Sequence, residues 1–183
     1  MRNEDFADNS NAHRISEEQF KSLMRSMAAS VAIIATNQDG RYHGMTATAM
    51  CSVSATPATL LIVINRSTRS HPIISATKYF TVNILAEHQQ AIGKRFASRH
   101  INPFDGIEHR VGFNGSLIIS EAAAYIECTT VAEIDVGTHT IFVGNIIGGD
   151  VSRARPLLYH DSKYKSVSPR LPDGDITASF FDV

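Results

Sequence analysis

The stretch that decides how this chain folds reads Gly44-Met45-Thr46-Ala47-Thr48-Ala49-Met50-Cys51-Ser52-Val53-Ser54, and Pro57 closes it. Its pattern is that of a β-strand built almost entirely from small and hydroxyl-bearing residues. A strand that only filled a core would carry Val, Ile and Phe at its inward positions. Small side chains would let a large flat ligand lie against the backbone, where hydroxyl and N–H groups can bond its polar edge and a phosphate. The alternative is an ordinary small-residue strand packed against a helix.

The composition of the 183-residue chain is that of one globular domain with a hydrophobic core. Hydrophobic residues make up 43% and charged residues 19%, and the formal net charge is -1. This near-neutral balance argues against nucleic-acid and anionic-membrane partners. No apolar run approaches the ~20 residues of a membrane span. Cys51 and Cys128 do not form a disulfide framework, so we expect two buried thiols in a cytoplasmic protein.

The chain begins with a mixed-charge segment that predicts a flexible arm over residues 1–15. Ser16 and Gln19 have the spacing of a capping box, which predicts the start of a helix. The apolar residues that follow recur at helical spacing and form one face, which we expect in the core. These residues are Phe20, Leu23, Met24 and Met27. One domain is expected over residues 16–167, followed by a polar surface tail over residues 168–183.

The rest of the chain predicts mainly β structure. Strands are expected at residues 31–36, 44–54, 59–65, 79–85, 124–134 and 139–147, with a further short one at 163–167. The turn at residues 37–40 joins the first two as a hairpin. His71-Pro72 opens a short helix, and residues 87–96 form another. Residues 98–116 form a long loop of the kind that is often functional. Six or so strands with short connections indicate an antiparallel sheet closed into a barrel.

Several common catalytic motifs are absent from the sequence. It contains neither G-x-G-x-x-G nor G-x-x-x-x-G-K-[ST], which argues against a Rossmann nicotinamide site and a P-loop. It also lacks G-x-S-x-G, H-x-x-x-H, H-E-x-x-H and C-x-x-C, so neither a serine hydrolase nor a metal site is expected. An organic cofactor would therefore carry the difficult chemical step.

The order of the segments resembles the short-chain flavin reductase family, the reductase partners of two-component flavin monooxygenases. The resemblance extends from about residue 20 to about residue 167. The matching segments are residues 44–49 with 51–54 and Pro57, then 64–67, 80–85, 95–97, 137–139, 142–144 and 156–159. Gly137-Thr138-His139 is similar to the form found in the reductase components of 4-hydroxyphenylacetate and chlorophenol monooxygenases. The family fold is a split β-barrel of Greek-key type with peripheral helices, in a homodimer that binds flavin near the subunit interface.

The resemblance implies a flavin site on the small-residue strand and the polar loop after residue 65. It places the ring and ribityl chain along Thr46, Ala47, Thr48, Cys51, Ser52, Val53 and Ser54. Hydroxyls, a guanidinium and helix-start N–H groups of the loop would hold the phosphate, because together they form an anion site. These residues are Ser67, Arg69, Ser70 and His71. Asn65 would fix the turn or contact the ribityl chain.

The resemblance implies that His139 positions the nicotinamide over the flavin, and the alternative is a histidine exposed at a strand start. Asn83 lies among apolar neighbours, so its amide requires a partner, which is either the flavin or a backbone carbonyl. Tyr164 is a packing residue that could border the site.

The function expected from the resemblance is an NAD(P)H:flavin oxidoreductase. It would take a hydride from NADH, or from NADPH, reduce FAD or FMN, and release reduced flavin to an oxygenase component. One alternative is a flavoenzyme that retains FMN and reduces a corrin, a ferric complex or a quinone. Another is a non-catalytic flavin- or haem-binding module of the same barrel class.

Overall fold

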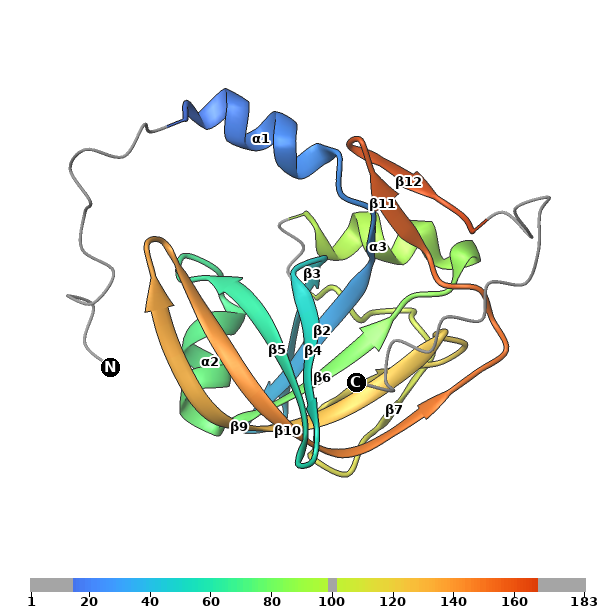
Figure 1. The fold of residues 1–183 in the computed structure, drawn as a ribbon. Helices are drawn as coiled ribbons and strands as arrows, with labels where there is room; N and C mark the ends of the chain where they lie inside the picture. The colour runs from blue at the N-terminus through green and yellow to red at the C-terminus, as the bar shows by residue number, and fades with distance from the viewer. Residues whose placement is uncertain (1–14, 99–101, 168–183) are drawn as a thin grey trace.

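The structure is a computed structural model that describes residues 15–98 and 102–167 (Figure 1). The expected tail lies outside the described residues, and so does the expected arm except for Ile15. A seven-stranded antiparallel sheet dominates the described part. The expected class, mainly β with an antiparallel sheet, is therefore confirmed.

The strands of this sheet hydrogen-bond in the order β3-β2-β6-β9-β10-β5-β4. They are β2 (Ala32–Gln38), β3 (Arg41–Ala47), β4 (Met50–Ala55), β5 (Ala58–Asn65), β6 (Tyr79–Ile84), β9 (Ala124–Val136) and β10 (His139–Val151). β3 and β4 lie at the two ends of that order, yet only Thr48 and Ala49 separate them in the chain. The sheet must therefore curl until β3 and β4 come together at this connection, which makes it a barrel whose two end strands are not hydrogen-bonded to each other in the described sheet.

The small-residue stretch is thus two strands rather than one. The break comes at Thr48 and Ala49. Before it β3 pairs with β2, and after it β4 pairs with β5. The Val63 N–H donates to the Ala49 carbonyl at 3.0 Å and so holds the segment between β3 and β4 against β5. Two smaller sheets complete the described structure, and of their strands the sequence predicted only the one at residues 163–167. One contains β1 (Ala29–Ser30), β11 (Leu158–His160) and β12 (Lys163–Lys165), and the other pairs β7 (His109–Val111) with β8 (Leu117–Ile119).

The barrel wall separates two hydrophobic clusters. Ala32 and Ile34 of β2 point into the barrel, whereas Val31, Ile33 and Ala35 point outward to a second cluster. Successive side chains of a strand alternate between faces, so β2 reads as a continuous apolar run because both of its faces are covered. Inside the barrel, Phe80 and Phe142 are fully buried.

Helices cover the barrel from outside and at one end. α2 (Ser70–Thr77) is the short helix that His71-Pro72 predicted, and its Ile74 belongs to the inner cluster. η2 (Glu87–Gln89) leads into α3 (Gln90–Phe96), whose Phe96 packs in the outer cluster beside Phe104.

α1 (Glu17–Arg25) lies apart from both clusters, above the barrel in Figure 1. Its capping box is present: the Gln19 N–H donates to Ser16 Oγ at 3.1 Å, and the Ser16 N–H donates to Gln19 Oε1 at 2.9 Å. The apolar face was expected in the core, and this prediction is wrong. Phe20, Leu23 and Met24 are between 45% and 55% exposed, because no element within residues 15–98 and 102–167 covers them.

Candidate functional site

The small side chains of β3 are explained in part by packing. A Cβ on Gly44 would lie 2.6 Å from Phe96 Cε1, so α3 can approach the strand only because position 44 is glycine. The Thr46 hydroxyl donates to the Gly93 carbonyl at 2.7 Å and is therefore committed to the same helix. Ala47 is buried in the inner cluster. The helix-packing alternative therefore accounts for Gly44 and Thr46, whereas Ala47 faces the inner cluster.

Two adjoining clefts open where β3 meets the start of α2. The turn cleft, about 390 Å³, lies between Gly44–Met45, the turn Ser67–Ser70 and the residues at and after the end of α3. The strand cleft, about 420 Å³, lies between residues 41–44 of β3, Arg69–Ser70 and residues 102–103. Gly44, Arg69 and Ser70 border both clefts. The structure thus brings together three residues that the sequence predicted to hold a phosphate: Ser67, Arg69 and Ser70.

Asn65 builds the turn that carries these residues. Its Oδ1 accepts from the Ser67 N–H at 2.9 Å and from the Ser67 hydroxyl at 2.8 Å, while its carbonyl accepts from the Thr68 hydroxyl at 2.9 Å. Of the two roles expected for Asn65, the structure shows that of fixing the turn. Arg66 is bound elsewhere, because it donates to the Gly137 carbonyl at 2.6 Å and lies 3.7 Å from Asp135. Arg69 is therefore the guanidinium that borders the clefts.

His139 opens β10 at the same end of the barrel. It lies directly opposite Asn65 in the β5–β10 register, and its Nδ1 is 2.9 Å from the Thr138 hydroxyl. It alternates with Thr140 and Phe142, which belong to the buried face, so its half-exposed side chain lies on the outer face of the barrel.

His71 was expected to hold the phosphate, and in the structure one of its ring nitrogens contacts another side chain. Its Nε2 lies 2.8 Å from the Thr140 hydroxyl, and its ring meets Phe142 edge-on at 5.3 Å between centroids. The Thr140 hydroxyl gives its only proton to Asp135 Oδ1 at 2.6 Å, so His71 Nε2 must be the donor to Thr140. His71 therefore ties α2 to the barrel and does not line either cleft.

The β4 residues of the predicted flavin site lie elsewhere. Cys51, Ser52, Val53 and Ser54 line a separate hollow of about 860 Å³ whose wall is apolar, with Leu60 and Val82 among its residues. Ser54 pairs with Thr59, whereas the turn that carries Ser67, Arg69 and Ser70 begins at the far end of β5, six residues or roughly 20 Å away. Within one chain, the predicted ring-binding and phosphate-binding residues do not form one pocket. Thr48 is half-buried at the crossing between the two regions.

The two cysteines differ in exposure. Cys128 is buried as expected, and burial followed by Glu127 raises the pKa of its thiol to about 12. Cys51 is exposed, so its predicted burial is wrong: it lies on β4, a strand at the end of the sheet order, and the described residues leave it uncovered.

Asn83 and Tyr164 are structural residues in this fold. The Asn83 side chain is fully buried, donates to the Leu117 carbonyl at 3.1 Å and accepts from the Ile119 N–H at 2.8 Å. Of the two partners expected for this amide, flavin or a backbone carbonyl, the structure shows backbone groups of β8. Tyr164 packs in the outer cluster and lines neither cleft, as expected of a packing residue.

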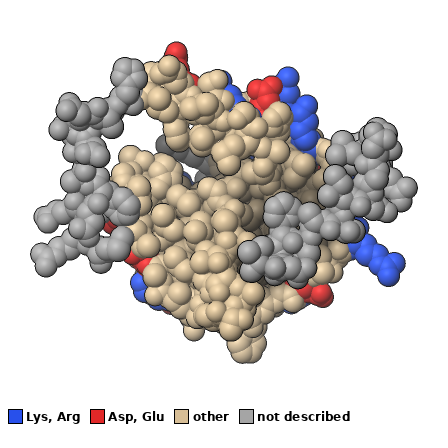
Figure 2. Space-filling view, viewed as in Figure 1, with Lys and Arg blue, Asp and Glu red and all other residues tan. Residues whose placement is uncertain are grey.

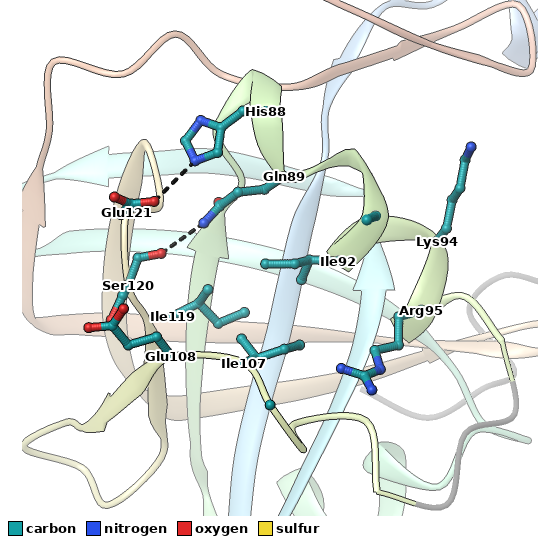
Figure 3. Close-up of a pocket in the computed structure, with 12 residues that line it drawn as sticks. His88, Gln89, Ile92, Lys94, Arg95, Ile107, Glu108, Ile119, Ser120 and Glu121 are labelled. Atoms are coloured by element: carbon teal, nitrogen blue, oxygen red, sulfur yellow. Dashed lines mark hydrogen bonds and ion pairs between the residues drawn. The ribbon is translucent and has the colours of Figure 1, made fainter.

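A further pocket, about 680 Å³, lies between η2, α3 and the segments around residues 107 and 120 (Figure 3). None of the predicted site residues line it. Two pairs of its polar groups contact each other: Gln89 donates to the Ser120 carbonyl at 2.7 Å, and His88 lies 3.4 Å from Glu121. Its acidic and basic side chains are mixed, so it offers no concentrated charge of either sign.

Sequence reasoning missed Arg41 and His43, which border the strand cleft with Arg69. Burial, followed by the charges of Arg69 and Arg41, lowers the pKa of His43. Only the alternating spacing of two basic residues after the Asp39-Gly40 turn could have pointed to them.

Within residues 15–98 and 102–167, no three His, Cys, Asp or Glu side chains gather as a metal site. None of the helices in the same ranges is long and apolar enough to cross a membrane.

Comparison with known proteins gives one consistent family. The family described as "Flavin reductase like domain" matches residues 24–168. The reductase component of an FADH(2)-dependent resorcinol hydroxylase from Rhizobium sp. (strain MTP-10005) is 37% identical over 158 residues, which cover 83% of this chain and 88% of that protein. Among solved structures, flavin reductase PheA2 in its native state is 31% identical with a TM-score of 0.79, and the match covers 85% of this chain and 100% of that one. A flavin reductase domain protein from Arthrobacter sp. FB24 is also 31% identical, with a TM-score of 0.80 over 88% and 100% of the two chains.

Proposed function

Because the chain belongs to the flavin reductase-like domain family, we propose that it is an NAD(P)H:flavin oxidoreductase that supplies reduced flavin to an oxygenase component. The observation that carries this proposal is the pair of joined clefts with Arg69 and Ser70 at their boundary. The names of relatives support it: besides the resorcinol hydroxylase component, a 28% identical protein of Rhodococcus opacus is the reductase component of a 4-nitrophenol monooxygenase.

The chemistry of the turn cleft fits a flavin phosphate. Ser70 is 3% exposed and borders the cleft, and a hydroxyl there can donate a hydrogen bond to a phosphate oxygen. Arg69 adds a guanidinium that can bind two phosphate oxygens at once. Together they would hold the phosphate and so fix the ribityl end of the cofactor.

His139 would position the nicotinamide. When bound, the flavin supplies a ring that accepts a hydride from the dihydropyridine. The chain has to hold the two rings in contact and exclude water, because orientation lowers the barrier for direct transfer. The half-exposed imidazole can donate one hydrogen bond and stack on a flat ring, and Thr138 holds its Nδ1.

We further propose a homodimer in which a second copy completes the ring-binding region. The face over β4, β5 and β10 carries few Lys, Arg, Asp or Glu side chains, and these gather at its rim (Figure 2). Exposed apolar side chains such as Val53 and Ile147 lie on these strands, and the outer edge of β4 is unpaired within the described sheet. Covering this face would remove apolar area and one sheet edge from water. A cytoplasmic location, where NADH is available, belongs to the same proposal.

The test is NADH oxidation by the purified full chain with FMN, with FAD and without flavin. We expect turnover only when flavin is added. A protein that keeps its flavin through gel filtration and gains nothing from added flavin would support the retained-FMN alternative. Absence of flavin-dependent NADH and NADPH oxidation would overturn the reductase proposal.

The role of His139 is tested separately by His139→Ala. Turnover should fall strongly while flavin affinity changes little, and His160→Ala on β11 serves as a control histidine outside the clefts. Unchanged turnover of His139→Ala would remove this residue from the mechanism.

A further inference from the structure

The tip of the β9–β10 hairpin, which presents His139, is held by a single residue from β5. Only Gly137 and Thr138 connect the two strands, because β10 begins directly at His139. Gly137 has a φ of +55°, which glycine adopts without strain. The Arg66 N–H donates to the Thr138 carbonyl at 3.0 Å, and the Arg66 guanidinium donates to the Gly137 carbonyl at 2.6 Å. Both carbonyls of the connection therefore accept from one residue just after β5.

Asp135 of β9 contacts the same Arg66 side chain. Its Oδ2 lies 3.7 Å from Arg66 Nη1, and its Oδ1 accepts from the Thr140 hydroxyl at 2.6 Å. Asp135 and Thr140 are direct partners in the β9–β10 register, so their side chains lie on one face of the hairpin. His71, in α2 beside the hairpin (Figure 1), donates to the Thr140 hydroxyl at 2.8 Å. These four residues form the hairpin clamp, a continuous series of contacts from α2 to the hairpin tip.

The hairpin clamp joins two separate parts of the candidate site. His71 directly follows Ser70, which borders both clefts, and Arg66 binds the loop that leads into His139. Side chains alternate along β10, so the clamp holds Thr140 on the buried face while His139 lies on the opposite face. Rotating the hairpin about its own axis would break these contacts and move the imidazole. The clamp therefore sets where the His139 side chain lies relative to the clefts.

The clamp adds orientation rather than stability. The Arg66 and Asp135 side chains are 46% and 44% exposed, and 3.7 Å is a long separation for an ion pair. A pair exposed to this degree contributes little to the free energy of unfolding. The hairpin is also closed without it, because Val136 and His139 already pair across the two strands. What the guanidinium supplies is one fixed orientation of the connection.

We propose that Arg66 and Asp135 are positioning residues, which hold His139 where it orients the nicotinamide over the flavin. This inference rests on the proposed function, because that function gives His139 its task. Neither Arg66 nor Asp135 lines the strand cleft or the turn cleft, so neither is placed to contact a phosphate there. Their effect on turnover should therefore pass through the imidazole.

The test compares two ion pairs of β9. Arg66→Gln and Asp135→Asn remove the charges of the hairpin clamp. Glu133→Gln and Lys78→Gln remove a matched ion pair two residues earlier on β9, which contacts the end of α2 rather than the hairpin tip. For each full-length variant, kcat and KM for NADH are measured at saturating flavin. The flavin dissociation constant and the urea midpoint are measured on the same samples.

Arg66→Gln should lower kcat/KM for NADH about tenfold, a part of the roughly hundredfold loss that a 1 Å misplacement can cause. Its flavin dissociation constant and urea midpoint should stay close to those of the two control variants. Asp135→Asn should act in the same direction more weakly, because an amide oxygen can still accept from Thr140. Arg66→Lys should restore part of the turnover, since an ammonium keeps the charge but lacks the planar fork that reaches both acceptors.

The decisive measurement combines Arg66→Gln with His139→Ala. Residues that act as one unit give losses that do not add, whereas independent residues give losses that do. If Arg66 acts through the imidazole, the double variant should turn over NADH about as fast as His139→Ala alone.

A full further loss in the double variant would overturn the inference, because Arg66 would then act independently of His139. Weakened flavin binding in Arg66→Gln, or an equal loss of turnover in Glu133→Gln and Lys78→Gln, would also overturn it. So would a turnover that falls in His139→Ala and stays unchanged in Arg66→Gln. Absence of flavin-dependent NADH oxidation by the unaltered chain would instead refute the proposed function itself, which is a distinguishable result.

Discussion

Replacing Asn83 with alanine should destabilise the fold severely without acting on flavin directly. The Asn83 amide is fully buried and links β6 to β8 through the Leu117 carbonyl and the Ile119 N–H. Alanine would leave both backbone groups without a partner in a place that water cannot reach. Each unsatisfied buried group costs about 1–3 kcal/mol, so the loss should be roughly 2–5 kcal/mol. A domain of this kind has about 5–15 kcal/mol in total, so the variant should still fold.

Urea unfolding followed by circular dichroism measures this loss as a shift in the midpoint at constant slope. Asn145→Ala is the matched control, because Asn145 is half-buried and makes one long contact, 3.3 Å, with the Thr59 hydroxyl. The unfolding free energy lost by Asn145→Ala should stay below about 1 kcal/mol. If Asn83→Ala were as stable as the control, or kept its stability and lost flavin binding, the structural role assigned to this amide would be refuted.

Three other predictions follow from the geometry. Gly44→Ala should cost about 1–3 kcal/mol in urea unfolding, because its Cβ would lie 2.6 Å from the buried Phe96 ring, and an unchanged midpoint would contradict this. In the native state Cys51 should react with iodoacetamide at pH 8 while Cys128 stays unmodified by mass spectrometry, since it is buried and the pKa of its thiol is about 12. The pKa of His43 is lowered by folding, so its contribution to stability is complete above its unfolded pKa of about 6.5 and is lost as the pH falls toward the folded value. His43→Gln should therefore flatten the pH dependence of the urea midpoint below about pH 6.5, and a parallel profile would refute the assignment.

Local features were predictable because a few neighbouring residues determine them. The capping box at Ser16 and Gln19 and the hairpin through Asp39-Gly40 formed as expected. The short strands β8 and β11 could not be recognised, because three residues carry no measurable periodicity and each is held by a partner distant in the sequence. The burial of the α1 face was predicted wrongly for a related reason: periodicity shows that a face is apolar but does not identify what covers it.

In the candidate site, too, some features were predictable from the sequence and others depended on the tertiary structure. The resemblance of ordered segments identified the family and implied an anion site at the hydroxyl and basic residues of 67–70. The destination of individual polar side chains was decided by the tertiary structure. His71 turns inward because Thr140 lies 2.8 Å away across the barrel, and Asn83 is occupied by β8. Arg41 and Arg69 meet only because the closed sheet brings β3 to the start of α2. Sequence specifies which groups are available, but charges and hydrogen bonds act over a few ångströms, and folding alone determines which groups come that close.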